Sequence, residues 1–421
     1  MVQIAILGYG VVGSGVAQVL RRNAAHIEKK AGDAITVKRV LDLREFPGDP
    51  VSALLTHDFE DILNDPEIQI VAEVMGGLEP AYTFVKQSLL AGKHVCTSNK
   101  ELVINHGAEL LSIARERELN FMFEASVGGG IPIVRPMNLA LTTDEVVAVA
   151  GILNGTTNYI LTHMSAFGKT FAEALADAQR LGYAEKDPAN DVEGYDACRK
   201  LAILLSLATG RQVDYREIET EGITGLHRAD FDFARAFGHQ IKLMVDGRVV
   251  PGGVEALTAP MLVHHQHPLS NVTDVFNGVL VQAKVTDNVM FFGRGAGKLP
   301  TAGAVVSDIV DVAKHLHRHI MHSWSREREP VLPLSGYVKR RMIRIAYEDK
   351  AKAFEAVNAL YGSPEPVCEL PGHPRQLTWL SAGETEKDSY ERVKRLSASP
   401  GIAGVKSVLR LYEPVLLKNE D

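Results

Sequence analysis

Residues 2–13 read VQIAILGYGVVG, and this stretch decides the fold of the first part of the chain. An apolar run of strand type ends at Gly8-Tyr-Gly10-Val-Val-Gly13, where a helical pattern begins. The first glycine permits a tight turn, the second lets the backbone approach a pyrophosphate, and the third allows close helix–strand packing. The helix N-terminus offers N–H groups to phosphate. We predict a dinucleotide site whose contacts are Gly8, Gly10, Val12 and Gly13; a glycine-rich turn in another α/β protein is the alternative.

Working outward, the same alternation of strand and helix continues along the chain. We expect strands over Ile35–Leu41, Ile68–Val74 and Lys93–Ser98, and a helix over Ala81–Ala91. Strands that alternate with helices of about 10–15 residues form βαβ units and a parallel sheet. The sequence therefore predicts an α/β protein with a Rossmann-like, doubly wound parallel sheet over residues 1–133.

The ends of two predicted strands supply further cofactor candidates. Asp42 stands where a carboxylate binds a ribose 2′-hydroxyl and repels a 2′-phosphate, whereas Arg44 is suited to bind that phosphate. The balance favours NAD and leaves NADP open. Asn99 and Lys100 follow the strand at 93–98, and polar groups at such strand ends usually face the ligand. For Lys100, an ordinary solvated lysine is the alternative.

The pattern changes after the first domain. Residues 134–325 are expected to form a mixed α/β domain for substrate binding and dimerisation, with a strand over Val146–Leu153. A helical pattern at 300–320 is expected to return to the first domain, and the polar stretch His315–Pro333 reads as a linker. Over 335–421, the order strand, helix, strand, strand, helix, strand predicts a small ferredoxin-like module.

Composition limits the classes of function. The 421 residues include 45 Lys and Arg against 52 Asp and Glu, a formal net charge of −7. This balance disfavours nucleic acid and anionic membranes as partners. The three cysteines, Cys96, Cys198 and Cys368, form no CxxC pair, which fits a reducing cytoplasm. No run reaches the roughly 18 apolar residues of a membrane span, so we expect a cytoplasmic protein that acts on a small molecule.

Residues 178–200, AQRLGYAEKDPANDVEGYDACRK, carry the strongest chemical signal. Four acids fall in a turn-rich stretch: Glu185, Asp187, Asp191 and Glu193. Asp196 and Lys200 then follow at the start of an apolar helix, where a spacing of four places them on one face. Exposed pairs of this kind are common and contribute only about 0.3–0.5 kcal/mol. A site for a cationic or zwitterionic small molecule explains both the pair and the acid-rich loop in front of it.

Residues 124–131, EASVGGGI, offer one carboxylate and several main-chain carbonyls that glycines make accessible. Oxygen ligands of this kind suit a hard cation rather than zinc. A glycine hinge between two domains explains the stretch equally well, so both interpretations stay open at this point.

Together these motifs resemble the homoserine dehydrogenase family. The likeness lies in residues 178–200, Asn154-Gly-Thr-Thr-Asn158, 124–131, Thr97–Lys100 and Gly293–Gly297, and it covers about residues 1–325. It implies an NAD(P)-dependent oxidoreductase that interconverts L-homoserine and L-aspartate 4-semialdehyde, on the route to threonine, methionine and isoleucine. It also implies a homodimer or a higher homo-oligomer.

The resemblance also implies chemical roles. During hydride transfer the substrate carbonyl becomes an alkoxide, which needs a cation or a proton donor. Lys200, and secondarily Lys100, would supply it, and Asp196 would help to fix both the substrate and Lys200.

The remaining implied contacts are with the substrate, the cofactor and a sodium ion. The substrate ammonium would be held by Glu185 and Asp191, and its carboxylate would be contacted by Gly155 and Thr156. The cofactor would be approached by Gly182 and Gly295. The sodium ion would be bound by Glu124 and by the carbonyls of Val127, Gly129 and Ile131.

The C-terminal module resembles the ACT domain that many members of this family carry, but it departs from the usual pattern. Where that domain has Asp-x-Pro-Gly-x-Leu after its first strand, this chain has Asp349-Lys-Ala351-Lys352-Ala-Phe354. Lysine at the glycine position blocks the close backbone approach that an amino-acid effector uses. We therefore do not expect threonine feedback through this module.

Two other functions compete with this interpretation. Aspartate-semialdehyde dehydrogenase would share the first domain, but its chemistry needs a thiol nucleophile with a base, and none of the cysteines lies in such a context. A non-catalytic NAD-binding sensor would use the C-terminal module for signalling. The Asp196–Lys200 pair argues against it, because a sensor has no evident need for both residues.

Overall fold

The computed structural model describes residues 1–320 and 324–414, which divide into two compact units. The first unit comprises residues 1–146, 199–215 and 291–329, and the second comprises 147–198, 216–290 and 330 onward. Both are discontinuous in sequence. These two units do not test the division into three domains that we expect from the sequence, so that division stays a prediction.

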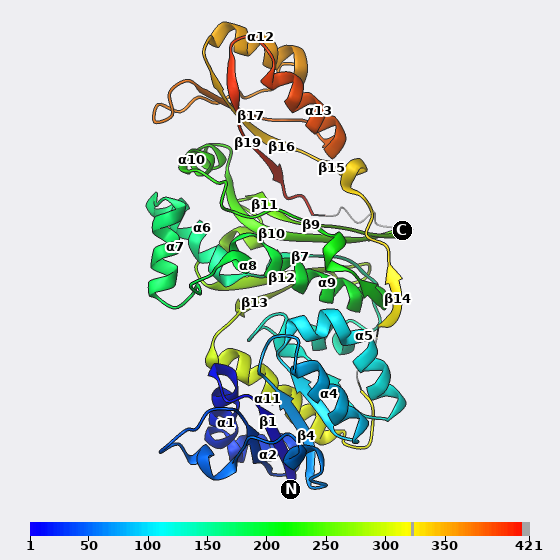
Figure 1. Cartoon of the computed structure of the whole chain (residues 1–421). Coiled ribbons are helices and arrows are strands. Elements are labelled where there is room, and N and C mark those ends of the chain that lie inside the picture. The colour runs from blue at the N-terminus through cyan, green and yellow to red at the C-terminus, as the bar shows by residue number, and fades with distance from the viewer. Residues whose placement is uncertain (321–323, 415–421) are drawn as a thin grey trace. The chain divides into compact units, whose positions relative to one another are not determined.

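The first unit is built on a six-stranded parallel sheet with the order β3-β2-β1-β4-β5-β6. Figure 1 labels two of its strands, β1 and β4. Its strands are β1 (Val2–Leu7), β2 (Ile35–Leu41), β3 (Leu55–Thr56), β4 (Ile68–Glu73), β5 (His94–Thr97) and β6 (Phe121–Met122). The strand order reverses between β1 and β4, which is where doubly wound sheets bind ligands. The predicted α/β class and parallel sheet are confirmed.

Helices flank this sheet in the order that βαβ units require. They are α1 (Val11–Arg22), α2 (Ala24–Ala31), α3 (Glu60–Leu63), α4 (Ala81–Leu90), α5 (Lys100–Glu116) and α11 (Lys298–Lys314). A Cβ on Gly15 would lie 2.9 Å from Cβ of Ala302, so α1 and α11 pack with their backbones close. The apolar helical pattern of the sequence continues as far as Ile27, but the structure divides it into α1 and α2 at Asn23, a poor helix former.

Shorter elements complete the first unit. The short helical turns are η1 (Pro50–Leu54), η2 (Glu124–Ser126) and η3 (Pro136–Ala140). The stretch expected to be a linker contains a strand, β14 (Ser325–Glu329), which pairs in parallel with β8 (Arg211–Val213). The linker prediction missed it because the sequence SRERE is charged and largely exposed, so it lacks the apolar alternation that identifies a strand.

The second unit contains a mixed sheet with the order β13-β12-β7-β10-β11-β19-β16-β17, to which β9 adds beside β11. The strands are β7 (Val146–Ile152), β9 (Glu219–Thr220), β10 (His239–Val250), β11 (Gly253–His264), β12 (Phe276–Ala283), β13 (Asp287–Arg294), β16 (Arg341–Tyr347), β17 (Gln376–Leu380) and β19 (Ile402–Leu411). The long β10–β11 hairpin is antiparallel, whereas β19 joins β11 in parallel. The sheet therefore runs without interruption into the C-terminal module.

Helices of the second unit carry most of the acid-rich motif. They are α6 (Gly155–Phe167), α7 (Phe171–Arg180), α8 (Ala189–Val192), α9 (Tyr195–Thr209) and α10 (Arg228–Ala236), with the short turns η4 (Tyr215–Glu217), η5 (Pro268–Asn271) and η6 (Leu334–Gly336). Helix α9 begins in the second unit and continues into the first from Arg199. Among the described residues, no helix has the length and apolar character to cross a membrane.

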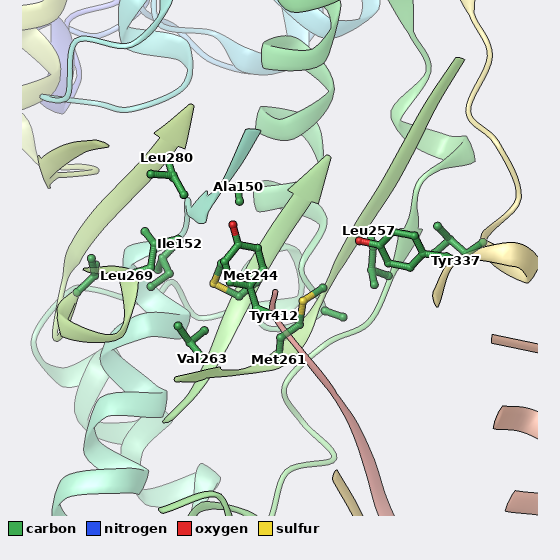
Figure 2. Packing of buried hydrophobic residues seen from close by; sticks show 13 residues of the cluster. Ala150, Ile152, Met244, Leu257, Met261, Val263, Leu269, Leu280, Tyr337 and Tyr412 are labelled. Atoms are coloured by element: carbon green, nitrogen blue, oxygen red, sulfur yellow. The ribbon is translucent and has the colours of Figure 1, made fainter. Parts of the chain in front are cut away.

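The C-terminal module, residues 335–414, adds α12 (Lys350–Tyr361) and α13 (Glu386–Ser397) to β16, β17 and β19, and its short strands β15 (Val338–Lys339) and β18 (Glu384–Thr385) pair with each other. Strand β16 lies between β17 and β19 and is antiparallel to both. A hydrophobic core of the second unit includes Tyr337 and Tyr412 from this module beside Met244 and Met261 (Figure 2). The module thus shares a core with the β10–β11 hairpin.

Candidate functional site

Asn154 organises the acid-rich motif within the second unit. It follows β7 and caps α6, because its side-chain oxygen accepts from the N–H of Thr157 at 2.9 Å. Its amide nitrogen donates to Oδ1 of Asp191 at 2.7 Å and to Oδ2 of Asp196 at 2.9 Å. The amide thereby draws together two carboxylates from different helices, α8 and α9. Asn154 and Asp196 are both buried.

The first turn of α6 lies beside these carboxylates. The first N–H groups of a helix have no intrahelical partner and favour a negative charge. Gly155 starts the helix, and a Cβ there would lie 2.9 Å from the carbonyl oxygen of Val275, so this position has no room for a side chain. The hydroxyl of Thr156 donates to the carbonyl of Tyr183 at 2.6 Å, which ties the helix to the acid-rich loop.

Glu185 lies apart from the cluster around Asn154. It is exposed in the loop after α7, where its carbonyl accepts from Nε2 of Gln179 at 3.0 Å. Of the side-chain contacts that Asn154 makes within the described chain, none reaches Glu185. Gly182 is likewise exposed, at the end of α7, with φ of +76°. The structure therefore joins Asp191 with Asp196 and leaves Glu185 on the surface.

Helix α9 carries the predicted acid–base pair. Asp196 lies in its first turn, and Lys200 follows one turn later at a half-buried position. Between and after them the helix is apolar, and Leu201 and Leu204 are fully buried. Both residues thus sit on a helix that packing holds in place, rather than on a flexible surface segment.

The turn after β1 has the geometry that a dinucleotide requires. Gly8 adopts φ of +92°, which residues with a side chain rarely do. A Cβ on Gly13 would lie 1.9 Å from the carbonyl oxygen of Gly8, so only glycine lets α1 approach the strand. A Cβ on Gly10 would meet nothing within 4 Å, which leaves open space over the helix N-terminus. Val12 is half-buried in the first turn of α1. These residues fit a bound pyrophosphate.

Asp42 and Arg44 form a bidentate ion pair at the end of β2. Nε and Nη2 of Arg44 donate to the two carboxylate oxygens at 2.9 Å each, and the N–H of Tyr9 adds a third donor at 2.7 Å. The hydrogen bonds from Arg44 hold the pKa of Asp42 well below its usual range. Asp42 is largely buried, whereas the Arg44 side chain is 62% exposed. Arg44 therefore balances the negative charge of Asp42 at the position where the 2′-hydroxyl or 2′-phosphate of a bound cofactor would lie.

Glu73, which the sequence analysis missed, organises the neighbouring strand ends. It ends β4, is fully buried, and accepts from the Thr97 hydroxyl at 2.5 Å and from the N–H of Met75 at 2.8 Å. Burial raises the pKa of Glu73. Asn99 caps α5 and donates to the carbonyl of Gly77 at 2.6 Å, and Lys100 is the first residue of that helix. The sequence did offer a signal for Glu73, because it is the single acid at the end of a buried strand that is otherwise uncharged.

The carboxylate of Glu124 is engaged by backbone N–H groups. Its oxygens accept from Ile133 at 2.6 Å, from Val134 at 2.9 Å and from Arg135 at 2.7 Å. Its own N–H donates at 2.9 Å to Asp308, and burial raises the pKa of Asp308 to about 7. Three charge-assisted bonds to one short segment fix the loop that follows Glu124.

That loop, residues 127–131, is packed tightly against the segment around Gly295. A Cβ on Gly129 would lie 2.4 Å from the Gly295 carbonyl oxygen, and the N–H of Gly130 donates to the carbonyl of Arg294 at 3.0 Å. Within residues 1–320 and 324–414, no three His, Cys, Asp or Glu side chains are grouped to hold a metal ion. Main-chain carbonyls are thus the donors that this loop offers, and such oxygens fit a hard cation.

The geometry of the second unit suits a zwitterionic amino acid. Two carboxylates held by one amide can neutralise an ammonium group, and the adjacent helix N-terminus can accept a carboxylate. In the first unit, the glycine turn and the strand ends of the parallel sheet suit a dinucleotide. These are the two ligands of an amino-acid oxidoreductase that uses a nicotinamide cofactor.

Comparisons with known proteins agree with this chemistry. A family model described as homoserine dehydrogenase matches residues 132–310, and one described as its NAD-binding domain matches residues 8–124. The homoserine dehydrogenase of Bacillus subtilis is 34% identical over 97% of this chain and 98% of its own. The crystal structure of a homoserine dehydrogenase from Thiobacillus denitrificans matches with a TM-score of 0.89, 35% identity and 98% coverage of both chains.

A more distant structure includes a cofactor. It is a mutant hyperthermophilic archaeal homoserine dehydrogenase in complex with NADPH, with 26% identity, a TM-score of 0.62, and coverage of 74% of this chain and 97% of that one.

Proposed function

The chain belongs to the homoserine dehydrogenase family, and from that premise we propose how its residues carry out the interconversion of L-homoserine and L-aspartate 4-semialdehyde. The protein is an oxidoreductase with an NAD(P)-binding domain. The proposal is carried by the contact of one amide, that of Asn154, with both Asp191 and Asp196.

Substrate binding follows from the charges of homoserine. Asp191 would hold the α-ammonium, with Glu185 closing over it from the exposed loop. The N–H groups of Gly155 and Thr156 at the start of α6 would donate hydrogen bonds to the α-carboxylate. Asn154 is neutral, so it keeps the acids close without cancelling the charge that attracts the ammonium.

Lys200 would manage the proton of the reacting oxygen. A nicotinamide cofactor, when bound, would supply the hydride for aldehyde reduction and accept it in homoserine oxidation. As negative charge builds on the carbonyl oxygen, the Lys200 ammonium would stabilise it and donate a proton, and the amine would accept that proton in the reverse direction. Asp196, one turn earlier on α9, would orient the lysine, and Lys100 at the start of α5 would give secondary support.

For the cofactor, we propose that the Asp42–Arg44 pair lets the protein use either NAD or NADP. The sequence favours NAD, but Arg44 offsets the charge that would repel a 2′-phosphate. Asp42→Ala should shift the ratio of kcat/KM toward NADP, and Arg44→Ala should shift it toward NAD, each by about tenfold. Steady-state kinetics with both cofactors measure the ratio. An unchanged ratio in both variants would show that other residues select the cofactor.

We also propose a sodium ion held by the carbonyls of Val127, Gly129 and Ile131. The Glu124 carboxylate, with three N–H donors of its own, would shape the loop and add negative charge near the cation. Melting temperatures in sodium chloride and in choline chloride at equal ionic strength test this, because only a bound ion stabilises the fold selectively. Equal melting temperatures would reject the site.

Three further features belong to the proposal. The C-terminal module would be a structural, ACT-like domain, and the protein would be a homodimer, which light scattering of the purified protein can check. Among the described residues, Cys96, Cys198 and Cys368 form no disulfide, and Cys96 and Cys198 are buried. Cysteines without disulfides fit a reducing compartment such as the cytoplasm.

A direct assay tests the proposed function. The purified protein is mixed with L-homoserine and either NAD or NADP, and formation of the reduced nicotinamide is followed by absorbance. We expect reduction that depends on L-homoserine and saturates with it. L-Aspartate and L-serine, which lack the terminal hydroxymethyl group at the right distance, serve as controls. Absence of homoserine-dependent reduction with both cofactors would reject the proposal.

A further inference from the structure

A short segment of the second unit, residues 219–224, lies directly against the acid-rich loop. The N–H of Ile223 donates to the carbonyl of Val192 at 2.8 Å. A Cβ on Gly222 would lie 2.7 Å from the carbonyl oxygen of Val192 and 2.8 Å from Cα of Glu193, so the two backbones are in direct contact. Val192 and Glu193 stand between Asp191 and Asp196 in the chain. A shift of residues 219–224 would therefore act on Val192 and Glu193, which directly follow Asp191.

The same segment is held from its other side by the C-terminal module. Nη1 of Arg410, on β19, lies 2.8 Å from Oε1 of Glu221. Nε and Nη2 of the same guanidinium donate to the carboxylate of Glu386 at 2.7 and 3.0 Å. The Arg410 side chain is only 10% exposed, and a planar guanidinium fixes both partners at once. One arginine thus joins the module to residues 219–224.

Strand β11 gives this link a rigid base. Thr220 pairs with Thr258 on β11, and Arg410 pairs with Met261 a short distance along the same strand. The N–H of Glu221 also donates to the carbonyl of Thr258 at 2.8 Å. Because hydrogen bonds to one strand fix both backbones, the ion pair between Glu221 and Arg410 joins positions that cannot drift independently.

The local charge explains why the link matters. Four acids gather here from three segments: Glu193, Glu219, Glu221 and Glu386. The pKa of Glu219 is raised by burial and by the neighbouring carboxylates Glu386 and Glu221, and Arg410 opposes that effect. The Arg410 guanidinium therefore offsets the repulsion among these carboxylates, and its bond to Glu221 helps to keep residues 219–224 in their packed position.

We propose that the Arg410–Glu221 pair positions the acid-rich loop for substrate binding, so that the C-terminal module supports the affinity for homoserine from a distance. The proposal rests on the assignment of Asp191 and Asp196 to the substrate site. Glu221 and Arg410 are positioning residues and do not touch the substrate. Loss of the pair should weaken homoserine binding more than it slows the chemical step, because Lys200 lies on α9, which is fixed by its own packing.

The experiment compares steady-state kinetics of Glu221→Ala, Glu221→Gln and the parent. Glu221→Ala should raise KM for L-homoserine about three- to tenfold with kcat within about twofold, and Glu221→Gln should recover part of the loss because it can still accept from Arg410. KM for the cofactor and the melting temperature should stay at the parent values. Glu369→Ala is the matched control, since it removes a 2.6 Å ion pair with Lys350 in the same module without touching residues 219–224.

The outcomes separate the proposal from its premise through one more variant, Asp191→Asn. If Asp191→Asn raises KM and Glu221→Ala does not, the positioning role is rejected and the substrate site stands. If neither variant raises KM, the substrate assignment itself fails, and the positioning role fails with it. A rise in KM with Glu221→Ala that Glu369→Ala reproduces would also overturn the proposal, because it would reflect general loosening of the module.

Discussion

The side-chain amide of Asn154 donates to the carboxylates of Asp191 and Asp196, and so holds two acids from different helices close together. Two carboxylates that share one donor can both interact with a single cation. The substrate ammonium would be such a cation, and it would interact with both acids at once. The same logic explains why a neutral amide, and not an arginine, occupies position 154.

At the residue scale, the two acids assigned to the substrate ammonium should contribute unequally to homoserine binding. Asp191 contacts Asn154, whereas Glu185 is exposed and outside that cluster. Asp191→Asn should therefore raise KM for L-homoserine by about tenfold or more, and Glu185→Gln by only about two- to fivefold, since solvent screens an exposed charge. Initial-rate kinetics over a range of homoserine concentrations measure both. Equal effects, or a larger effect at Glu185, would contradict this ranking.

Sequence alone indicated Asp191, Asp196, Lys200 and the glycine turn, because each lies in a local pattern with a chemical meaning. It did not indicate Asn154 or Glu73 as organising residues. Their roles depend on partners far away in sequence: Asn154 reaches 37 and 42 residues ahead, and Glu73 reaches 24. Local spacing cannot predict contacts of this range, since they arise from the packing of separate elements.

At the scale of elements, the strands were predicted closely because buried parallel strands form continuous apolar runs between turn residues. Elements that depend on tertiary partners were missed. Strand β14 is stabilised by β8 rather than by burial of its own side chains. The boundary between α1 and α2 at Asn23 was also missed, because the apolar pattern continues across it as far as Ile27.

Helix α6, strand β10 and the turn η5 are joined by a buried cation, Lys242. The residue is only 2% exposed, and its ammonium donates to the carbonyl of Val272 at 2.6 Å and lies 3.4 Å from the amide oxygen of Asn158. Burial lowers the pKa of Lys242 to about 8. Both acceptors are neutral, so the charged form is stabilised only in part.

The lowered pKa predicts how stability depends on pH. The folded protein binds fewer protons than the unfolded chain between the pKa of about 8 and the ordinary value of about 10.4, so the free energy of unfolding should rise with pH in that window. It should fall again as pH falls through 8. Replacing Lys242 by Met should remove about 1–3 kcal/mol of this rise.

Urea unfolding of the parent and of Lys242→Met at several values between pH 7 and 9.5 gives the comparison. Lys387→Met, a change at an exposed lysine, is the control and should keep the parent slope. If the parent and Lys242→Met show the same slope, the buried ammonium does not control stability in this range.

At the scale of the whole molecule, the C-terminal module is an integral part of the second unit. The ammonium of Lys339 and the hydroxyl of Tyr337 reach the fully buried carboxylate of Asp246 on β10, the former at 3.0 Å. The N–H of Tyr412 donates to the carbonyl of Leu262 at 2.9 Å, and the Tyr412 ring joins the core of the sheet (Figure 2). The order of elements in the sequence predicts the C-terminal module. It does not predict the contact of the module with β10, because Lys339 and Asp246 are more than 90 residues apart.

A chain that ends near Ser335 should therefore not fold as a stable enzyme. It would bury Asp246 without Lys339, and loss of one partner of a buried ion pair costs about 3–5 kcal/mol. It would also expose the edge of β11 that pairs with β19. Circular dichroism melts and size-exclusion chromatography should show a lost or strongly lowered transition and aggregation. A truncated protein that melts like the parent would show that the module is an independent appendage.

The turnover of Lys200→Ala is the decisive measurement for Lys200 as the group that takes up the proton in L-homoserine oxidation. We predict that kcat for L-homoserine oxidation falls by about 100-fold or more, while cofactor binding and the melting temperature stay at the parent values. Turnover within about tenfold of the parent, in a variant that folds and binds NAD normally, would contradict the assignment and transfer the role to Lys100.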